Sequence, residues 1–436
     1  MGDGEIIRCY GFNITAAEYN CAEHWHVCYR CPTLEPDPDI AGIGVTIAFL
    51  LSSFSTLVGS LLHLLILRSR VRDRESYNPI DRYLRRRVAV PLFRQPRCKE
   101  QGGGGKVEEA LFQFVQSMSD AQLASGLGVL LAGIIKLRHD TISIYHFSVV
   151  TNFGWLSSNV HLLSLLSIRT RVFGSLKRAE RVEYARATAG RGGVLGWAGR
   201  AFGLWGDVMV RSALMVGMVG MLLYCSWVGA WKEWNSQYEC PARCALGRPK
   251  GGGPLAWAIA SMILAVWGYG SHLFLLCIPL QVLWLDRFRS RFIDNKTEPD
   301  HPMKGWQKLA RVPWYFLGSE ALQWITDGLV WFVWGCYWIG SDMREVRKGG
   351  SSWAPGVWEE EFNILGFGQL VPIMLFILPF WQVLSSYCYL IQPPDVRNAH
   401  GEILLPMRSS FLSSCWAGRF QILPKYQILS FKRLIE

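Results

Sequence analysis

Seven long apolar segments alternate with polar stretches along this 436-residue chain. Each segment reaches the roughly 20 residues that a helix needs to cross about 30 Å of hydrocarbon. Lipid offers no partner to backbone N–H and C=O groups, so each segment is predicted to be a helix. The pattern predicts an all-α fold, a polytopic membrane bundle of about seven transmembrane helices. The predicted spans are 41–67, 110–137, 142–168, 206–230, 255–285, 315–340 and 363–391.

The basic residues between these spans predict how the bundle is oriented. Lys and Arg number twelve in 68–106, eight in 169–204 and seven in 286–314, with six in 392–436. The alternate stretches 1–39, 136–140, 231–254 and 341–361 hold two, two, four and three. Short basic loops stay on the cytoplasmic side of a membrane. We therefore expect the N-terminus outside and the C-terminus in the cytoplasm.

Three regions follow from this topology: an outer tail (1–40), the membrane bundle (41–391) and a cytoplasmic tail (392–436). The formal net charge is +11, and most of the excess lies in loops beside apolar spans. Anionic lipid headgroups are the partners that such loops favour. No nucleic-acid-reading motif is present, so nucleic acid is not predicted as a partner. The oligomeric state is left open.

Six of the twelve cysteines fall on the outer side under this topology. An even number of cysteines in an oxidising compartment is typical of disulfides. Six cysteines allow fifteen pairings, so the sequence leaves the connectivity open. We expect at least one bridge from the N-terminal tail to the loop between the fourth and fifth spans. The six residues are Cys9, Cys21, Cys28, Cys31, Cys240 and Cys244.

A metal site is the weaker alternative for part of this set. His24, His26, Cys28 and Cys31 have a spacing that can hold zinc or copper. Thiols outside the cell oxidise, so disulfides are favoured over a metal here. No cofactor is predicted, and the chain contains no phosphate-binding loop, nucleophile elbow or dinucleotide fingerprint.

Two glycosylation sequons lie on opposite sides of the predicted membrane. Asn13 begins one in the outer tail and is expected to carry a glycan, whereas Asn295 begins one in a basic inner loop. An outer face of this kind favours the plasma membrane. The endoplasmic reticulum and the vacuole present the same lumenal side and remain alternatives.

Polar residues inside the spans are the candidates for function, because ionisable groups are costly in hydrocarbon. Glu320 and Asp327 are seven residues apart, nearly two helical turns, and are expected on one face. Tyr145, Asn152 and Asn159 repeat this spacing in the third span. We predict that one polar site forms between the second, third and sixth spans. Its candidate residues are Asp120, Tyr145, His146, Asn152, Glu320 and Asp327. The alternative is that these residues only bond the helices together.

Residues 119–162 resemble uncharacterised polytopic membrane proteins of filamentous fungi. The resemblance rests on three segments: SDAQLASGL at 119–127, ISIYHF at 142–147 and WLSSNVHL at 155–162. It implies a fungal origin, a multi-span fold and a link to secondary metabolism, and it implies no activity. The residues that the resemblance marks are Asp120, Gln122, Tyr145, His146, Trp155, Ser157, Ser158 and His161.

These features favour a receptor- or sensor-like membrane protein, or an accessory protein of secondary metabolism. Fold alone does not decide function. One alternative is an integral-membrane enzyme, a cyclase or isomerase of an apolar metabolite that uses a buried carboxylic acid. Another is a transporter of such a metabolite. Whether the chain is an enzyme stays open. An apolar small molecule is the partner common to all of these hypotheses.

Overall fold

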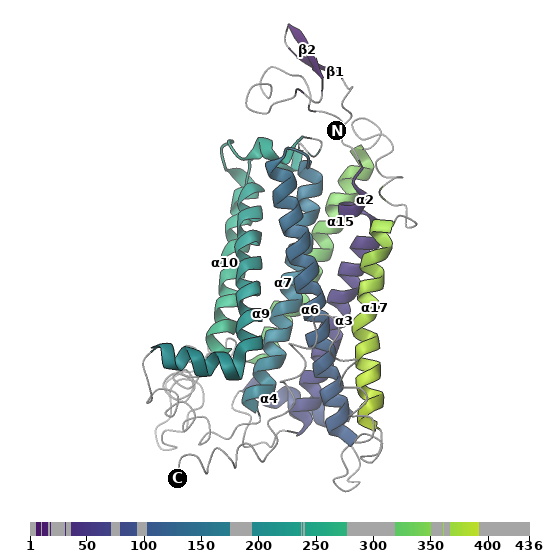
Figure 1. Cartoon of the computed structure of the whole chain (residues 1–436), viewed down its shortest axis with the longest axis vertical. Coiled ribbons are helices and arrows are strands. Elements are labelled where there is room, and N and C mark those ends of the chain that lie inside the picture. The colour runs from purple at the N-terminus through teal and green to yellow at the C-terminus, as the bar shows by residue number, and fades with distance from the viewer. Residues whose placement is uncertain are drawn as a thin grey trace.

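The structure is a computed structural model, and helices dominate it (Figure 1). It describes residues 6–9, 11–15, 18, 31, 36–70, 79–93, 103–174, 194–236, 238, 240–276, 319–349, 361 and 367–391. The predicted cytoplasmic tail, 392–436, lies outside these residues, as do Cys21, His24, His26, Cys28 and Asn295. The all-α prediction is confirmed for the described bundle.

Within the described residues, seven long helices run mostly side by side along the long axis of the molecule (Figure 1). They are α3 (Ile43–Arg70), α6 (Gly103–Arg138), α7 (Ile144–Gly174), α9 (Val194–Val228), α10 (Gly252–Leu276), α15 (Trp331–Gly349) and α17 (Phe367–Ile391). A short antiparallel hairpin of β1 (Ile6–Cys9) and β2 (Phe12–Thr15) lies beyond one end of the bundle.

Short elements complete the described chain. Near the hairpin end lie α2 (Pro38–Ala41), η4 (Trp234–Ser236) and η5 (Ala242–Ala245). Towards the opposite end lie α4 (Pro79–Leu84), η3 (Arg85–Ala89) and α5 (Val90–Phe93). The helix that ends in α15 begins as α14 (Glu320–Trp324) and continues as the π-helix η7 (Ile325–Val330).

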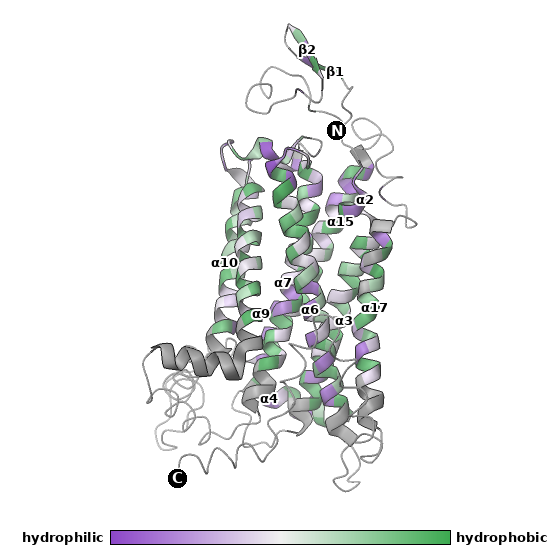
Figure 2. Cartoon of the chain, in the orientation of Figure 1, coloured by the Kyte–Doolittle hydropathy of each residue, from purple (hydrophilic) through white to green (hydrophobic). Residues whose placement is uncertain are grey.

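Four helices of the described chain are long and apolar enough to cross a membrane. They are Pro38–Ile66, Val107–Arg138, Val210–Val228 and Gly252–Leu273, which coincide with the first, second, fourth and fifth predicted spans. Hydrophobic residues predominate along α9, α10 and α17 (Figure 2), and large apolar side chains on them are exposed, such as Val216, Ile263 and Trp381. Such a surface suits lipid better than water.

The third predicted span, α7, is the central helix of the bundle. It packs against α3, α6, α9, α10 and α15. Side chains on every face of it are buried from Ile144 to Ile168 except at a few half-buried positions. A helix surrounded by protein needs no lipid-compatible face, so it tolerates polar residues that bond to its neighbours. Burial among its neighbours therefore explains why α7 can lie at the centre of the bundle although its hydropathy is lower than that expected of a membrane span.

Small residues let α6 approach α7 closely. A Cβ atom added at Gly126 would lie 2.6 Å from Ser157 Oγ, and one at Gly133 would lie 2.7 Å from Val150 Cγ1. Close backbone approach through small residues is typical of membrane helix pairs. The α6–α7 pair therefore forms the rigid centre on which the candidate site is built.

Candidate functional site

The N-terminal end of α7 is held by hydrogen bonds to the loop between α9 and α10. The Ile144 N–H donates to the Cys240 carbonyl (2.8 Å), the Tyr145 N–H to the Tyr238 carbonyl (3.2 Å), and the Ala242 N–H to the Ile142 carbonyl (2.9 Å). These bonds hold residues 238–242 against the first turn of the helix. The loop therefore positions its side chains next to those of α7.

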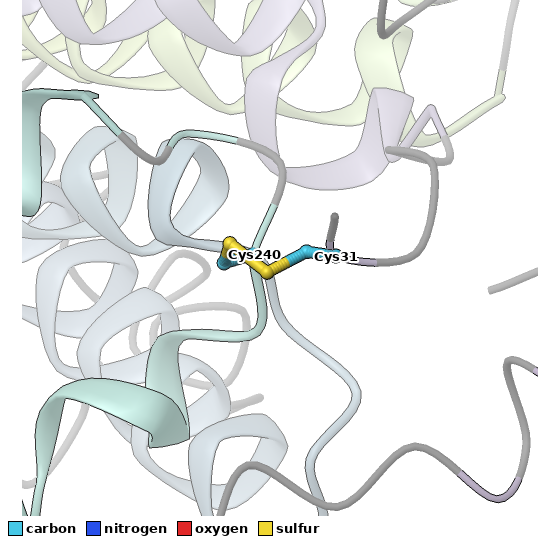
Figure 3. The surroundings of a disulfide bond; sticks show 2 residues. All are labelled: Cys31 and Cys240. Atoms are coloured by element: carbon cyan, nitrogen blue, oxygen red, sulfur yellow. A yellow bond between two sulfur atoms is a disulfide. The ribbon is translucent and has the colours of Figure 1, made fainter. Parts of the chain in front are cut away.

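A disulfide ties the N-terminal tail to this loop (Figure 3). Cys31 and Cys240 are bonded, 209 residues apart in the chain. The expected bridge from the tail to this loop is confirmed, and Cys244 is disulfide-bonded as well. The metal alternative is wrong for Cys31, because a disulfide sulfur is no thiolate ligand. No group of three or more metal-ligating side chains occurs among the described residues.

Ser143 caps α7 and orients the first candidate residue, His146. Its Oγ accepts the His146 backbone N–H (3.2 Å) and lies 2.8 Å from His146 Nδ1. Serine is a preferred N-cap residue because its oxygen satisfies a helix N–H that has no partner within the helix. The capping serine thus also holds one ring nitrogen of His146, which leaves Nε2 to face another group.

That group is Glu361, whose carboxylate is completely buried. His146 Nε2 lies 2.6 Å from Glu361 Oε1, with the side chains 4% and 0% exposed. The Tyr145 hydroxyl donates to Oε2 (3.3 Å), and the Asp37 N–H donates to Oε1 (3.3 Å). A buried carboxylate is tolerated only when such partners replace water. Glu361 therefore joins α7 to the segment before α2.

A second buried carboxylate, Asp342 of α15, lies beside this group. Asn152 Nδ2 donates to its Oδ2 (2.8 Å), and the Tyr238 hydroxyl donates to its Oδ1 (3.2 Å). Asp342 lies two residues beyond the expected sixth span. Burial raises the pKa of Asp342 to about 7, although both hydrogen bonds act to lower it. Burial and the Asp342 carboxylate raise the pKa of Tyr238, which keeps this phenol protonated as a donor.

These residues form what we call the outer polar cluster, after the side on which the sequence predicts them: Tyr145, His146, Asn152, Tyr238, Asp342 and Glu361. The Tyr145 ring joins its two halves, because its centroid lies 4.9 Å from that of His146 and 6.5 Å from that of Tyr238. Three members were expected from the sequence. The other three lie in the polar stretches beyond the predicted spans, where ionisable side chains are ordinary and give no signal in the sequence.

The remaining candidates lie elsewhere in the bundle. Asp327 pairs with His272 of α10, at 2.9 Å between Oδ2 and Nε2, rather than with another candidate of the predicted site. Asp120 pairs with Arg211 of α9 at 2.6 Å. The predicted single site is therefore not formed by these contacts.

Glu320 and Asp327 also have different neighbours. The Glu320 N–H donates to Asp81 Oδ2 (3.3 Å) at the start of α14, and Ser319 Oγ donates to the same carboxylate (2.9 Å). The intervening π-helix η7 has a wider turn than an α-helix. The seven-residue spacing consequently does not give two side chains on one α-helical stripe.

Polar residues of the resemblance join α6 to α7 in the inner half. Ser157 Oγ donates to Gln122 Oε1 (2.9 Å), Gln122 also bonds Ser52 of α3, and Ser119 Oγ lies 3.1 Å from His161 Nδ1. All of these side chains are buried. Their bonds to one another support the alternative interpretation, in which polar residues hold the helices together.

An apolar layer separates this inner group from the outer polar cluster. Phe153 of α7 stacks on Phe49 of α3 with ring centroids 4.5 Å apart, and Trp155 stacks on Trp331 at 5.3 Å. Leu156 packs so closely on α15 that a Cβ at Gly335 would lie 2.7 Å from it. The outer polar cluster is thus closed towards the centre of the bundle.

Comparison with known proteins gives one weak match. The chain is 25% identical over 132 residues to the "Elsinochromes biosynthesis cluster protein HP3" of Elsinoe fawcettii. The match covers 30% of this chain and 46% of that protein, so it spans about half of the relative's length. No family model matches the chain, and no solved structure matches it significantly.

Proposed function

We propose that this chain is a receptor- or sensor-like multi-pass membrane protein whose outer polar cluster responds to protonation. The observation that carries the proposal is the buried Asp342 carboxyl, whose pKa of about 7 places its ionisation near neutral pH. A carboxyl that stays neutral until this pH does so because burial penalises its charge. Ionisation therefore adds a charge to a closed cluster.

The contacts of the cluster support a role as a switch. Its members come from α7, α15, the Tyr238 loop and the chain around Glu361, and Asp37 extends it to α2. A change of charge at Asp342 can act on all of these segments because the two hydrogen-bonded halves of the cluster meet at α7 and at the Tyr145 ring. A local change of charge at a cluster that connects several segments is a common way to switch a protein between two conformations.

The topology in this proposal has seven spans, with the N-terminus outside and the C-terminus inside. Treatment with endoglycosidase is expected to shift the mobility of the wild type, since Asn13 is exposed on β2. Asn13→Gln should abolish the shift, and the control Asn295→Gln should leave it intact. A glycan on Asn295 would contradict the orientation.

We further propose a role in fungal secondary metabolism, at the plasma membrane. The relative's printed name places that protein in a biosynthesis cluster, and the resemblance of residues 119–162 points the same way. The partners in this proposal are membrane lipids and an apolar small molecule. The basic inner loops suit anionic headgroups, and the exposed apolar faces of α9 and α10 suit lipid.

An enzyme is the second candidate, because the cluster contains groups that can transfer protons. Ser143, His146 and Glu361 form a hydrogen-bonded chain, and Asp342 is a carboxylic acid with a pKa near the working range of a general acid. This arrangement suits a cyclase or isomerase that protonates an apolar metabolite.

Metabolite profiling of a deletion strain separates the two candidates. A sensor predicts that a whole set of products falls together and that no precursor accumulates. An enzyme predicts one accumulated precursor, which microsomes from the wild type convert and those from Asp342→Asn do not. Unchanged metabolites in the deletion strain would contradict both candidates.

A further inference from the structure

A second ionisable pair, outside the outer polar cluster, lies on the membrane-facing side of the bundle. His272 Nε2 and Asp327 Oδ2 are 2.9 Å apart, and Thr326 Oγ lies 3.3 Å from Asp327 Oδ1. The His272 side chain is 1% exposed, whereas that of Asp327 is 17% exposed. The histidine is thus inside the bundle, and the carboxylate lies at its edge.

The backbone that carries Asp327 is held in an unusual form. Asp327 lies in the π-helix η7, and Asn159 Nδ2 of α7 donates to the carbonyl of the next residue, Gly328 (3.0 Å). A Cβ atom at Gly328 would lie 2.8 Å from Leu57 and 2.9 Å from Leu163, so only glycine fits. Single π-helical turns inside α-helices occur frequently at functional sites. This one fixes the carboxylate in place.

The surface around Asp327 is apolar and faces outwards. Ile325 and Leu329 are each 40% exposed, and Val330 is 54% exposed. Asp327 lies eight residues from the start of the helix at Ser319, or about 12 Å along the axis. At that depth a carboxylate at the lipid boundary is costly, and such groups tend to serve a function.

A stacked pair of tryptophans lies about one turn further along the same helix. Trp331 stacks on Trp155 of α7 with centroids 5.3 Å apart and planes 12° apart. Trp331 follows Asp327 by four residues, so the helix carries an acceptor for a hydrogen bond about one turn from a flat surface for a second ring system. Aromatic pairs gain energy beyond their buried area, which favours an aromatic ligand there.

We propose that Asp327, His272 and Trp331 form a binding site for a membrane-soluble aromatic molecule that bears a phenolic hydroxyl. The phenol donates a hydrogen bond to the Asp327 carboxylate, and its ring system lies against Trp331. A phenol is a neutral donor, so it reaches this depth more easily than an ammonium group does. Hydrogen bonds to an ionised acceptor are also stronger than neutral ones. The site does not depend on the outer polar cluster.

Photolabelling of the full-length protein in lipid nanodiscs tests this site. The probe is a naphthol that carries a diazirine and an alkyne, and the matched control is its methyl ether, which cannot donate a hydrogen bond. The phenol should label peptides from η7, α10 or the start of α15 in preference to the ether. Asp327→Leu should reduce labelling about tenfold, the size of effect expected on losing a hydrogen bond to a charged group.

Matched variants keep the result interpretable. Asp120→Asn removes a carboxylate elsewhere in the inner half and should label as the wild type does, and so should Asp342→Asn, which alters only the outer polar cluster. Asp327→Asn keeps the shape and an acceptor oxygen and should give intermediate labelling. A single elution peak and an intact Cys31–Cys240 bond establish that each variant is folded.

Four results would overturn the assignment. These are equal labelling by the methyl ether, normal labelling of folded Asp327→Leu, labels confined to helices other than η7, α10 and α15, and loss of labelling in Asp342→Asn. A photoreactive sterol that labels η7 more strongly than the naphthol would show instead that a lipid hydroxyl is the natural occupant, and would overturn the aromatic class.

Discussion

Glu361→Ala should lower the free energy of unfolding by about 3–5 kcal/mol, because each of the three partners of its buried carboxylate costs about 1–3 kcal/mol when left unsatisfied. The substitution leaves His146 Nε2, the Tyr145 hydroxyl and the Asp37 N–H without their shared acceptor in a region closed to water. Each unsatisfied buried group adds a desolvation penalty. The measurement is denaturant unfolding of the purified protein in detergent, at fixed pH.

A conservative variant of Glu361 and a control variant at another glutamate show what this loss of stability means. Glu361→Gln retains an oxygen and the shape of the side chain, so it should lose less than half as much. Glu345→Gln changes an exposed glutamate of α15 and should remain within about 0.5 kcal/mol of the wild type. If Glu361→Ala were as stable as Glu345→Gln, Glu361 would not hold the cluster together.

Asp342→Asn should make the protein less stable than the wild type at acidic pH and more stable than the wild type at neutral pH. The pKa of Asp342 is about 7 in the folded chain, against an ordinary value of 3.8. Between these values the folded state holds a proton that the unfolded state has lost. The wild type is therefore most stabilised by this group below about pH 4, loses that stability as the pH rises to 7, and changes no further above 7.

The expected loss is on the order of 4 kcal/mol, since each pKa unit corresponds to about 1.4 kcal/mol. Asparagine does not titrate. Its Oδ1 can accept from Asn152 Nδ2, but its Nδ2 carries two hydrogens where the protonated carboxyl carries one, and only the Tyr238 hydroxyl faces them, so the variant should be about 1 kcal/mol less stable than the wild type at pH 4. At pH 7.5 it should be the more stable of the two. Melting curves from pH 4 to 8 measure the crossing point.

Glu345→Gln is again the control, and its melting curves should run parallel to those of the wild type. A constant difference between wild type and Asp342→Asn at every pH would contradict the role of Asp342 as the titrating group. That outcome would also remove the observation on which the proposed sensor function rests. Both sets of curves need the same detergent, because detergent binding changes apparent stability.

The candidate site shows where reasoning from the sequence ends. Tyr145, His146 and Asn152 were found because polar groups inside a predicted span are conspicuous. Tyr238, Asp342 and Glu361 were missed because carboxylates and phenols are ordinary in polar loops. Their importance comes from burial, and burial at the end of the bundle depends on the tail and loop that Cys31–Cys240 joins.

The sequence by itself determined the helical class, four helices with the length and hydropathy of a membrane span, and the presence of a bridge between tail and loop. Hydrophobic runs and cysteine placement are local properties, so they can be read without a partner. Only the tertiary structure decided that the polar helix α7 is central and that Glu361 faces His146 across 215 residues. It also decided that Asp327 meets His272. Such pairs depend on how distant helices pack and, at η7, on a π-helical turn that the usual 3.6-residue period does not anticipate.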